Sequence, residues 1–305
     1  MVIIKTVNYM KQLLSAALVI TIAASCNKTS VSDPAFSVTA ASTTIKVNDT
    51  ARFAFSGNPG YITFYSGEPG HVYENRNRVT GDGAPLLQFT SYMQTGTQAN
   101  SLQLMVSTNF SGSYDSASVS NASWTDITSR AKLSTGTDNT ASGVADLTDF
   151  LNGGKPVYFA FKYTGIAGSA QRTWTIKNFA LNNVLKADSS VFPILTLPMI
   201  DSGWKPVNVK NTAINWTFST TQLQVKGNTT TGSIATEAWI VSKALTLNRV
   251  TPDIGVPLKN MTTALNAYTY IYKTAGTYTA SFAVSNTTKY DSKNDTKQLQ
   301  ITVTP

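Results

Sequence analysis

Alternating apolar and polar residues recur along most of the chain and predict short β-strands. The clearest runs lie at 61–65, 102–106, 157–163 and 173–176. Stretches rich in Gly, Pro and Asn separate the runs, as at 56–60. Alternation with a period of two, bounded by turn residues, is typical of half-buried strands. We find no amphipathic helix longer than two or three turns, so the pattern predicts an all-β fold of sandwiches or barrels.

The first 25 residues have a different pattern. Lys5 and Lys11 precede an apolar run at 13–24, which is shorter than the roughly 20 residues of a membrane-spanning helix. Small residues end this run directly before Cys26, the single cysteine of the chain. A short apolar run with these flanks is typical of an export signal. It resembles a bacterial lipoprotein signal, which implies cleavage before Cys26 and lipid attachment to it. The alternative is an ordinary signal peptide with a chance cysteine, or a cysteine that is a buried free thiol.

The length of the remaining chain indicates two β domains, since one seven-stranded sandwich takes roughly 100 residues. After the signal peptide (1–25) and a polar tether (26–32), we predict an immunoglobulin-like sandwich built from 33–75 together with 262–305. A jelly-roll domain at 76–261 is then inserted between the two halves of this sandwich.

Two resemblances support that arrangement. One segment near the C-terminal end resembles the closing hairpin of polycystic-kidney-disease-type (PKD) domains. It has an aromatic strand at 268–272, a turn at Gly276 and a strand around Tyr278. The Trp-Asp-Phe-Gly-Asp-Gly segment usual in those domains is absent. In the middle, the runs at 102–112 and 157–163, with Trp124, Trp174 and Trp239, resemble jelly-roll modules of the choice-of-anchor-J type, which are related in shape to carbohydrate-binding modules.

Over residues 33–305 the chain resembles an uncharacterised lipoprotein family of Bacteroidota, found in polysaccharide-utilisation loci. The resemblance implies an envelope location, with the outer membrane and its outer surface as the expected site, and a setting beside glycan-uptake complexes. It implies no catalytic motif and no particular ligand.

The composition excludes several kinds of chemistry. One His and one Cys exclude multi-His metal centres, Cys-ligated clusters and an intrachain disulfide framework. The 24 basic and 16 acidic residues give a net charge of +8, but the basic residues are scattered. A nucleic-acid-binding surface would cluster them, so we expect no nucleic-acid partner. Neither a Gly-x-Ser-x-Gly elbow nor a phosphate-binding glycine loop is present.

The candidate binding residues gather around one loop. Aromatic rings and groups able to bind sugar hydroxyls lie close together there, and loops on a rigid sandwich often carry function. The loop supplies Tyr65, Glu68, His71, Tyr73 and Arg76. Trp204, in the loop-like stretch 201–206, is expected to be an exposed aromatic. The other four Trp residues lie in strand-like runs and are expected in the core.

No cofactor is expected, and a structural calcium ion is left as an alternative. The aspartates that could supply oxygen ligands in the jelly roll are Asp115, Asp126, Asp138, Asp146 and Asp149. Their spacing matches no linear calcium loop.

Three functions are weighed. The first is a non-catalytic lipoprotein that binds glycans for capture and uptake. The second is a structural or adhesive surface protein without a sugar site. The third is a glycan hydrolase, which needs two facing carboxyl groups, whereas the chain has only Glu68, Glu74 and Glu237 besides its aspartates. The first is favoured.

Overall fold

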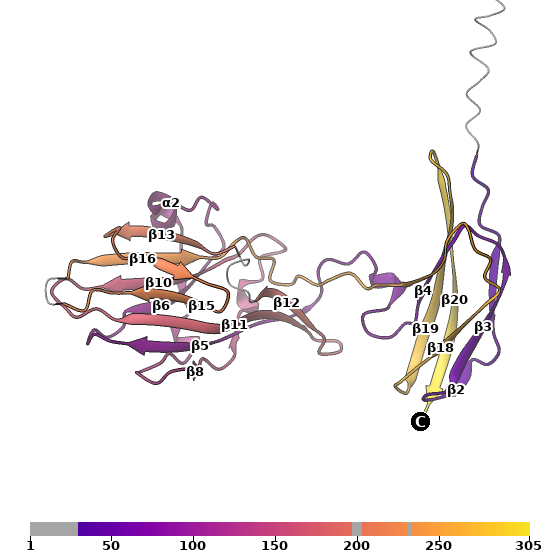
Figure 1. Cartoon of the computed structure of the whole chain (residues 1–305), viewed down its shortest axis with the longest axis horizontal. Helices are drawn as coiled ribbons and strands as arrows, with labels where there is room; N and C mark the ends of the chain where they lie inside the picture. Colours follow the sequence, from indigo (N-terminus) through magenta and orange to yellow (C-terminus); the bar gives the residue numbers. More distant parts are fainter. Residues whose placement is uncertain (1–29, 197–202, 231–232) are drawn as a thin grey trace, which may run out of the picture. The chain divides into compact units, whose positions relative to one another are not determined.

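The computed structural model describes residues 30–196, 203–230 and 233–305. The chain forms two units (Figure 1). Unit 1 contains the chain up to Arg76 together with Asp253–Pro305, and unit 2 is Asn77–Pro252. Both are built from mainly antiparallel sheets packed as sandwiches, so the all-β fold class is confirmed.

Unit 1 has two sheets. One consists of β1 (Phe36–Ala40), β3 (Thr50–Gly57) and β18 (Ala267–Ile271), in that order. The other has the order β17 (Val256–Lys259), β4 (Tyr61–Tyr65), β19 (Gly276–Thr287), β20 (Ser292–Thr304) and β2 (Thr44–Lys46). Each sheet takes strands from both ends of the chain. All pairs are antiparallel except β2 with β20, which are parallel.

Aromatic side chains fill the space between these two sheets. Alternation along each strand turns Phe53, Phe64 and Phe282 inward, where each is 1% exposed or less. The ring centroids of Phe53 and Phe64 each lie 5.1 Å from that of Phe282. Buried aromatic pairs at this spacing add to the stabilisation from burial itself. The core of unit 1 is therefore a contact between segments more than 200 residues apart in sequence.

A tyrosine fixes the turn between the two sheets. The Tyr278 hydroxyl, near the start of β19, donates a hydrogen bond to the Thr274 carbonyl oxygen at 3.0 Å. This bond lies at the corner between β18 and β19, and it corresponds to the tyrosine corner of immunoglobulin-like sandwiches. The fold of unit 1 is immunoglobulin-like in this detail as well.

Unit 2 is inserted between β4 and β17. We predicted that the inserted domain ends at residue 261. Because β17 pairs with β4, the structure instead assigns residues 253–261 to unit 1. The points where the chain leaves unit 1 and returns to it are held together, because the Asp253 amide donates a hydrogen bond to the Asn75 carbonyl oxygen at 3.2 Å. Within unit 2, Thr80 and Arg249 form a β-bridge. Each unit thus closes its own ends.

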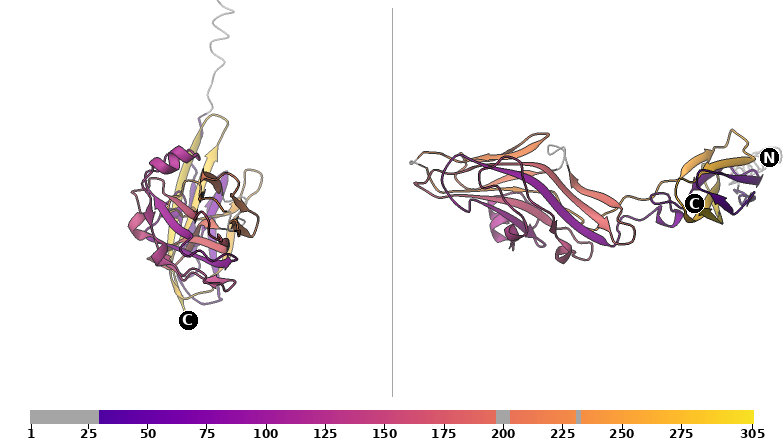
Figure 2. Two further views of the ribbon diagram at one scale, coloured as in Figure 1. Left: turned by 90° about the vertical axis from the view of Figure 1, so that its left-hand side faces the viewer. Right: turned by 90° about the horizontal axis from the view of Figure 1, so that it is seen from below.

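Unit 2 is a sandwich of two antiparallel sheets, seen as separate layers in Figure 2. The first has the order β13 (Lys205–Lys210), β16 (Thr236–Val241), β10 (Tyr158–Gly165), β6 (Leu102–Ser107) and β7 (Thr125–Asp126). The second has the order β14 (Trp216–Phe218), β15 (Gln222–Lys226), β11 (Thr173–Leu185), β5 (Gly83–Gln94) and β8 (Thr140–Ala141). In addition, β12 (Val191–Thr196) pairs with β11, and β9 (Ala145–Asp146) pairs with β5.

The first sheet of unit 2 is covered on both faces. Its inner face packs Phe159 and Phe161 into the main core. Its outer face carries a smaller cluster under α2 (Ser116–Asn121), in which Val119 packs with Trp239. The described residues also form three 3-10 helices: η1 (Tyr73–Asn75) in unit 1, and η2 (Thr128–Arg130) and η3 (Thr148–Phe150) in unit 2.

The closure of each unit on its own ends predicts that the two fold independently. A chain in which a short Gly-Ser linker joins Arg76 to Asp253 should fold, because Asn75 and Asp253 are already hydrogen-bonded. Residues 77–252 alone should fold as well. Circular dichroism and thermal melting of each piece test this, and both should unfold cooperatively.

The matched control for the joined unit is Phe282→Ala, which should cost about 3–5 kcal/mol and leave unit 1 largely unfolded. Non-cooperative melting of either wild-type piece would show that the units depend on each other.

Candidate functional site

A hollow lies on the outer face of the five-stranded sheet of unit 1, and three of the expected binding residues line it. Its volume is about 330 Å³. Ile62 and Phe64 point into the core, so Tyr61, Thr63 and Tyr65 on the same strand face outward. We call this feature the tyrosine hollow. The residues that line it include Tyr61, Tyr65, Tyr73, Arg76, Asn294 and Asp295.

The short helix η1 forms one wall of the tyrosine hollow. The Tyr73 hydroxyl accepts a hydrogen bond from Thr296 Oγ1 at 2.7 Å, which ties η1 to β20. The Tyr73 ring stands edge-on to Tyr65, with centroids 5.4 Å apart. The Arg76 guanidinium lies 3.8 Å from the centre of the Tyr73 ring and donates to the Tyr73 carbonyl at 2.9 Å. Arg76 is therefore held in place by a cation–π contact and a hydrogen bond.

Strand β20 contributes Asn294, Asp295 and Thr296 to the lining of the hollow. Asp295 on β20 pairs with Lys297 at 2.8 Å. The hydrogen bond from Lys297, followed by that from the Thr296 backbone, holds the pKa of Asp295 below its usual range. Asp295 is paired in register with the buried Val284, so its side chain lies on the other face of the sheet, and the tyrosine hollow combines phenol rings, a guanidinium and the polar side chains of Asn294 and Thr296. Together these groups can contact the apolar face of a ring and exchange hydrogen bonds with hydroxyls.

Two other expected residues lie in the same loop but do not line the hollow. Glu68 accepts a hydrogen bond from the Tyr270 hydroxyl at 2.5 Å. Burial raises the pKa of that hydroxyl, and the bond to Glu68 raises it further. His71 is exposed, and its Nδ1 lies 2.6 Å from the Ile254 carbonyl oxygen. Both side chains hold the loop against neighbouring segments of unit 1.

The expectation for Trp204 is wrong. Its side chain is 1% exposed and belongs to the core of unit 2, 5.4 Å from the ring of Phe179. The residue directly precedes β13, and its side chain points between the sheets. The turn residues around it suggested a loop, but the burial of a large ring decided its direction. Its Nε1 has no hydrogen-bond partner among the described residues.

Cys26 lies outside the described residues. Among those that are described, no helix has the length and apolar character needed to cross a bilayer.

The five aspartates considered for calcium have protein partners. Asp115 caps α2, and Asp126 and Asp146 each accept from the threonine two residues later, at the starts of η2 and η3. Asp149 pairs with Arg130 at 2.6 Å, and Asp138 with Lys177 at 3.5 Å. Within the described chain no three His, Cys, Asp or Glu side chains gather as a metal site. The calcium ion stays a prediction.

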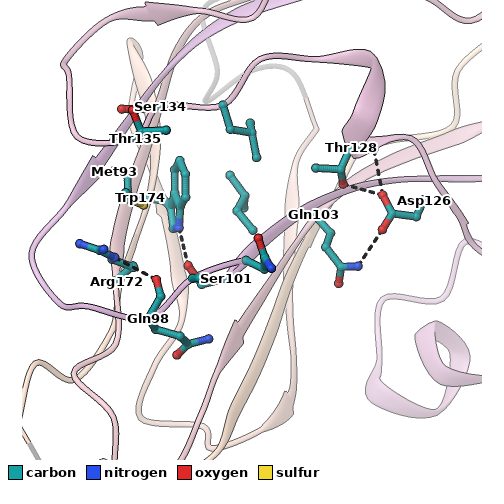
Figure 3. Close-up of a pocket in the computed structure, with 14 residues that line it drawn as sticks. Met93, Gln98, Ser101, Gln103, Asp126, Thr128, Ser134, Thr135, Arg172 and Trp174 are labelled. Atoms are coloured by element: carbon teal, nitrogen blue, oxygen red, sulfur yellow. Dashed lines mark hydrogen bonds between the residues drawn. The ribbon is translucent and has the colours of Figure 1, made fainter.

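A second, larger recess lies in unit 2, and the sequence did not point to it. Its volume is about 570 Å³ (Figure 3). It opens where two very short edge strands stop. β7 pairs only with Met105 and Val106 of β6, and β8 pairs only with Thr90 and Ser91 of β5. Beyond them the space between the sheets is open at the side. We call this recess the edge cavity. The residues that line it include Gln103, Asp126, Leu133, Thr135, Arg172 and Trp174.

The edge cavity has apolar walls and charged ends. Trp174 is 3% exposed, and its Nε1 donates to Ser101 Oγ at 2.8 Å. Leu133 packs against the core beside it. At one end Arg172 donates to the Gln98 and Thr95 carbonyls, each at 2.9 Å, and it also contacts Gly96 O. This guanidinium closes the loop that follows β5.

At the other end lies the carboxylate of Asp126 (Figure 3). Gln103 Nε2 donates to it at 2.7 Å, and the Thr128 amide donates at 2.8 Å. Partial burial pushes the pKa of Asp126 upward, but the hydrogen bonds from Thr128 and Gln103 and the charge of Lys162 outweigh it, so the pKa is lowered. The edge cavity therefore offers an ionised acceptor beside an apolar wall.

Fold and recesses define a protein of two β-sandwich units, each with a recess lined by aromatic and polar residues. Residues 25–204 match the model of a family described as a domain of unknown function, DUF5017. The chain belongs to this family. The match includes every lining residue of the edge cavity, whereas part of the tyrosine hollow comes from β19 and β20, after the matched range. No curated protein and no solved structure matches the chain.

The lowered pKa values in unit 2 predict acid sensitivity. Asp115, Asp126 and Asp149 have pKa values below the ordinary 3.8, owing mainly to hydrogen bonds from Ser118, from Thr128 with Gln103, and from Arg130. Their contribution to stability is complete above about pH 4 and is lost as the pH falls through their folded-state pKa values. The melting temperature of residues 77–252 should be steady from pH 7 to 5 and should fall steeply below about pH 4.

Asp126→Asn gives the site-specific check. The variant should melt below the wild type at pH 6, and the difference should shrink as the pH falls through the folded-state pKa of Asp126, where the wild-type carboxylate takes up a proton. A constant difference across this range would contradict the assignment.

Proposed function

We propose that this protein is a non-catalytic lipoprotein of the cell envelope that binds glycans in support of polysaccharide capture and uptake. The observation that carries the proposal is the tyrosine hollow. Tyr65, Tyr73 and Arg76, selected as binding residues from the sequence, line one recess together with Tyr61, which is 40% exposed.

The chemistry of this recess suits a sugar. A pyranose ring has an apolar face of C–H groups and a rim of hydroxyls. Tyr61 and Tyr65 offer phenol rings on the sheet surface, while Asn294 and Thr296 on β20 offer polar groups on the same face. Arg76 covers Tyr73 and presents a fixed set of donors. A few oriented polar groups around apolar contacts are typical of ligand sites.

The edge cavity supports the same function at a second position. A volume of about 570 Å³ lies in the range of small-molecule sites. Its apolar wall around Trp174 and Leu133 and its acceptor Asp126 fit one sugar unit with its hydroxyls towards the carboxylate. Two weak sites on one chain, displayed many times on a membrane, would hold a polymer by avidity.

The positions of the glutamates favour binding over hydrolysis. Glycosidases place two carboxyl groups roughly 5–10 Å apart across the bond they cleave. Glu68 bonds to Tyr270 on the three-stranded sheet of unit 1, and Glu74 bonds to Gln298 on the other sheet. Glu237 lies in unit 2, where it accepts from Trp239 Nε1 at 2.9 Å. A hydrolase therefore stays a lesser alternative.

The location is proposed from the sequence. The basic start, the short apolar run and Cys26 resemble a lipoprotein signal, and the wider resemblance is to outer-membrane proteins that work beside uptake complexes. A structural or adhesive surface protein is the other candidate, and it requires the same anchor without a sugar site.

The glycan proposal predicts that Tyr61 and Tyr65 contribute to affinity. The soluble form from residue 27 onward should bind on a glycan array. By titration calorimetry, Tyr61→Ala should then weaken binding about tenfold, equivalent to about 1.4 kcal/mol. Tyr290→Ala, an exposed tyrosine outside both recesses, is the matched control and should bind as the wild type does.

Thr135→Trp separates the two sites. Thr135 is exposed and lines the edge cavity, so a large side chain there should fill its mouth and leave the tyrosine hollow unchanged. No binding across a broad array would favour the adhesive alternative, and turnover of a polysaccharide would favour the hydrolase.

The anchor proposal predicts that Cys26 carries the lipid. Cells grown with a clickable fatty-acid analogue should label the wild type, and Cys26→Ala should lose the label because the acceptor sulfur is gone. Ser25→Ala, which keeps a small residue before the cysteine, is the control and should still be labelled. Labelling of the Cys26→Ala variant would refute lipidation at this residue.

A further inference from the structure

The β19–β20 hairpin projects beyond the sheet of unit 1. The two strands stay paired as far as Thr287 with Ser292, but β4 accompanies β19 only as far as Ser285. The turn is closed by the Thr288 amide, which donates to the Asp291 carbonyl at 2.8 Å. At its tip Tyr290 is 70% exposed.

The start of the described chain is fastened beside this hairpin (Figure 1). Asn286 Nδ2 donates to the Ser32 carbonyl at 3.0 Å, while Asn286 Oδ1 accepts from the Gly60 amide at 2.7 Å. Met261 lies next to Gly60 at this same end and is 61% exposed. The end of unit 1 where the chain enters therefore carries an exposed aromatic ring and an exposed apolar side chain.

Covalent geometry limits how far this end can lie from the anchor. Ser32 lies six positions after Cys26, and six Cα–Cα steps span at most about 20 Å when fully extended. The three residues from Asn286 to Lys289 advance about 10 Å along the hairpin. A lipid on Cys26 would thus hold the membrane surface within reach of the hairpin tip.

We propose that the hairpin tip, formed by Lys289, Tyr290 and Lys293, rests on the phospholipid headgroups. Tyrosine rings favour the interface between headgroups and acyl chains. Lysine side chains extend their amines to phosphate groups while their stems lie along apolar surface. Tyr290 and Lys289 already lie together, with Nζ 5.5 Å from the ring centre.

The contact is weak without a tether. Asp33 and Asp291 belong to the same end and offset part of the positive charge. The anchor raises the local concentration of the tip at the membrane, so that a small affinity suffices. The proposal rests on the lipid anchor of the proposed function and is independent of glycan binding. It would orient unit 1 with its N-terminal end towards the bilayer.

The test supplies the tether artificially. The chain from residue 27, with a hexahistidine tag in place of Cys26, is bound to vesicles of phosphatidylcholine, phosphatidylglycerol and a nickel-chelating lipid. Replacing Cys26 leaves no native cysteine, so Thr287→Cys carries a unique dye beside the tip. Ala275→Cys, just before the other end of β19, is the matched control. Nitroxide-labelled headgroups should quench the dye at 287 at least threefold more than the dye at 275.

A second variant checks the side chains responsible. Lys289→Glu, Tyr290→Ser and Lys293→Glu together, with the dye kept at 287, should reduce quenching to the level of the control while tethering persists. Equal quenching at 287 and 275 in the wild type would overturn the proposal, and so would unchanged quenching in the triple variant. Because the tag replaces the lipid, either result leaves the tests of lipidation and glycan binding unaffected.

Discussion

The structure depends on the pairing of strands from the two ends of the chain in unit 1. β4 lies between β17 and β19, and β3 lies between β1 and β18, so neither sheet exists without residues after 253. The cost of bringing such distant segments together grows only slowly with the length of the loop between them. Unit 2 lowers this cost further, because its own ends are paired at Thr80 and Arg249. Once unit 2 has folded, the loop that unit 1 must close is short.

The segment between β4 and unit 2 also builds part of the tyrosine hollow. The segment that follows β4 and leads to unit 2 turns at Gly67 and Gly70 and then packs back against the sheet as η1. Hydrogen bonds from Thr296 to Tyr73 and from Gln298 to Glu74 fasten it to β20. Without this segment, the face of the sheet would lack Tyr73 and Arg76. A segment needed to connect the units thus also supplies one wall of a recess.

Period-two alternation sufficed to predict much of the fold and part of the candidate site. It located β4, β6, β10 and the start of β11 but not the long strand β5. The aromatic strands at both ends indicated that the two ends share one sandwich. It failed for Trp204, because turn residues describe the backbone and say nothing about which way a large side chain faces. It also missed the edge cavity. That cavity exists because β7 and β8 are each only two residues long. The lengths of edge strands follow from tertiary pairing rather than from local pattern.

The extent of the family match has a physical consequence. The matched range ends at residue 204, within unit 2 and directly before β13. Unit 1 would then lack β17 to β20, and its Phe53 and Phe64 would lose Phe282. Unit 2 would lack β13 to β16, leaving β10 with an unpaired edge and Phe161 without Trp216. A segment ending at 204 therefore closes neither sandwich. The smallest folded body that contains the matched residues must continue through β20, because only that strand and its hairpin partner complete the sheet on which the tyrosine hollow lies.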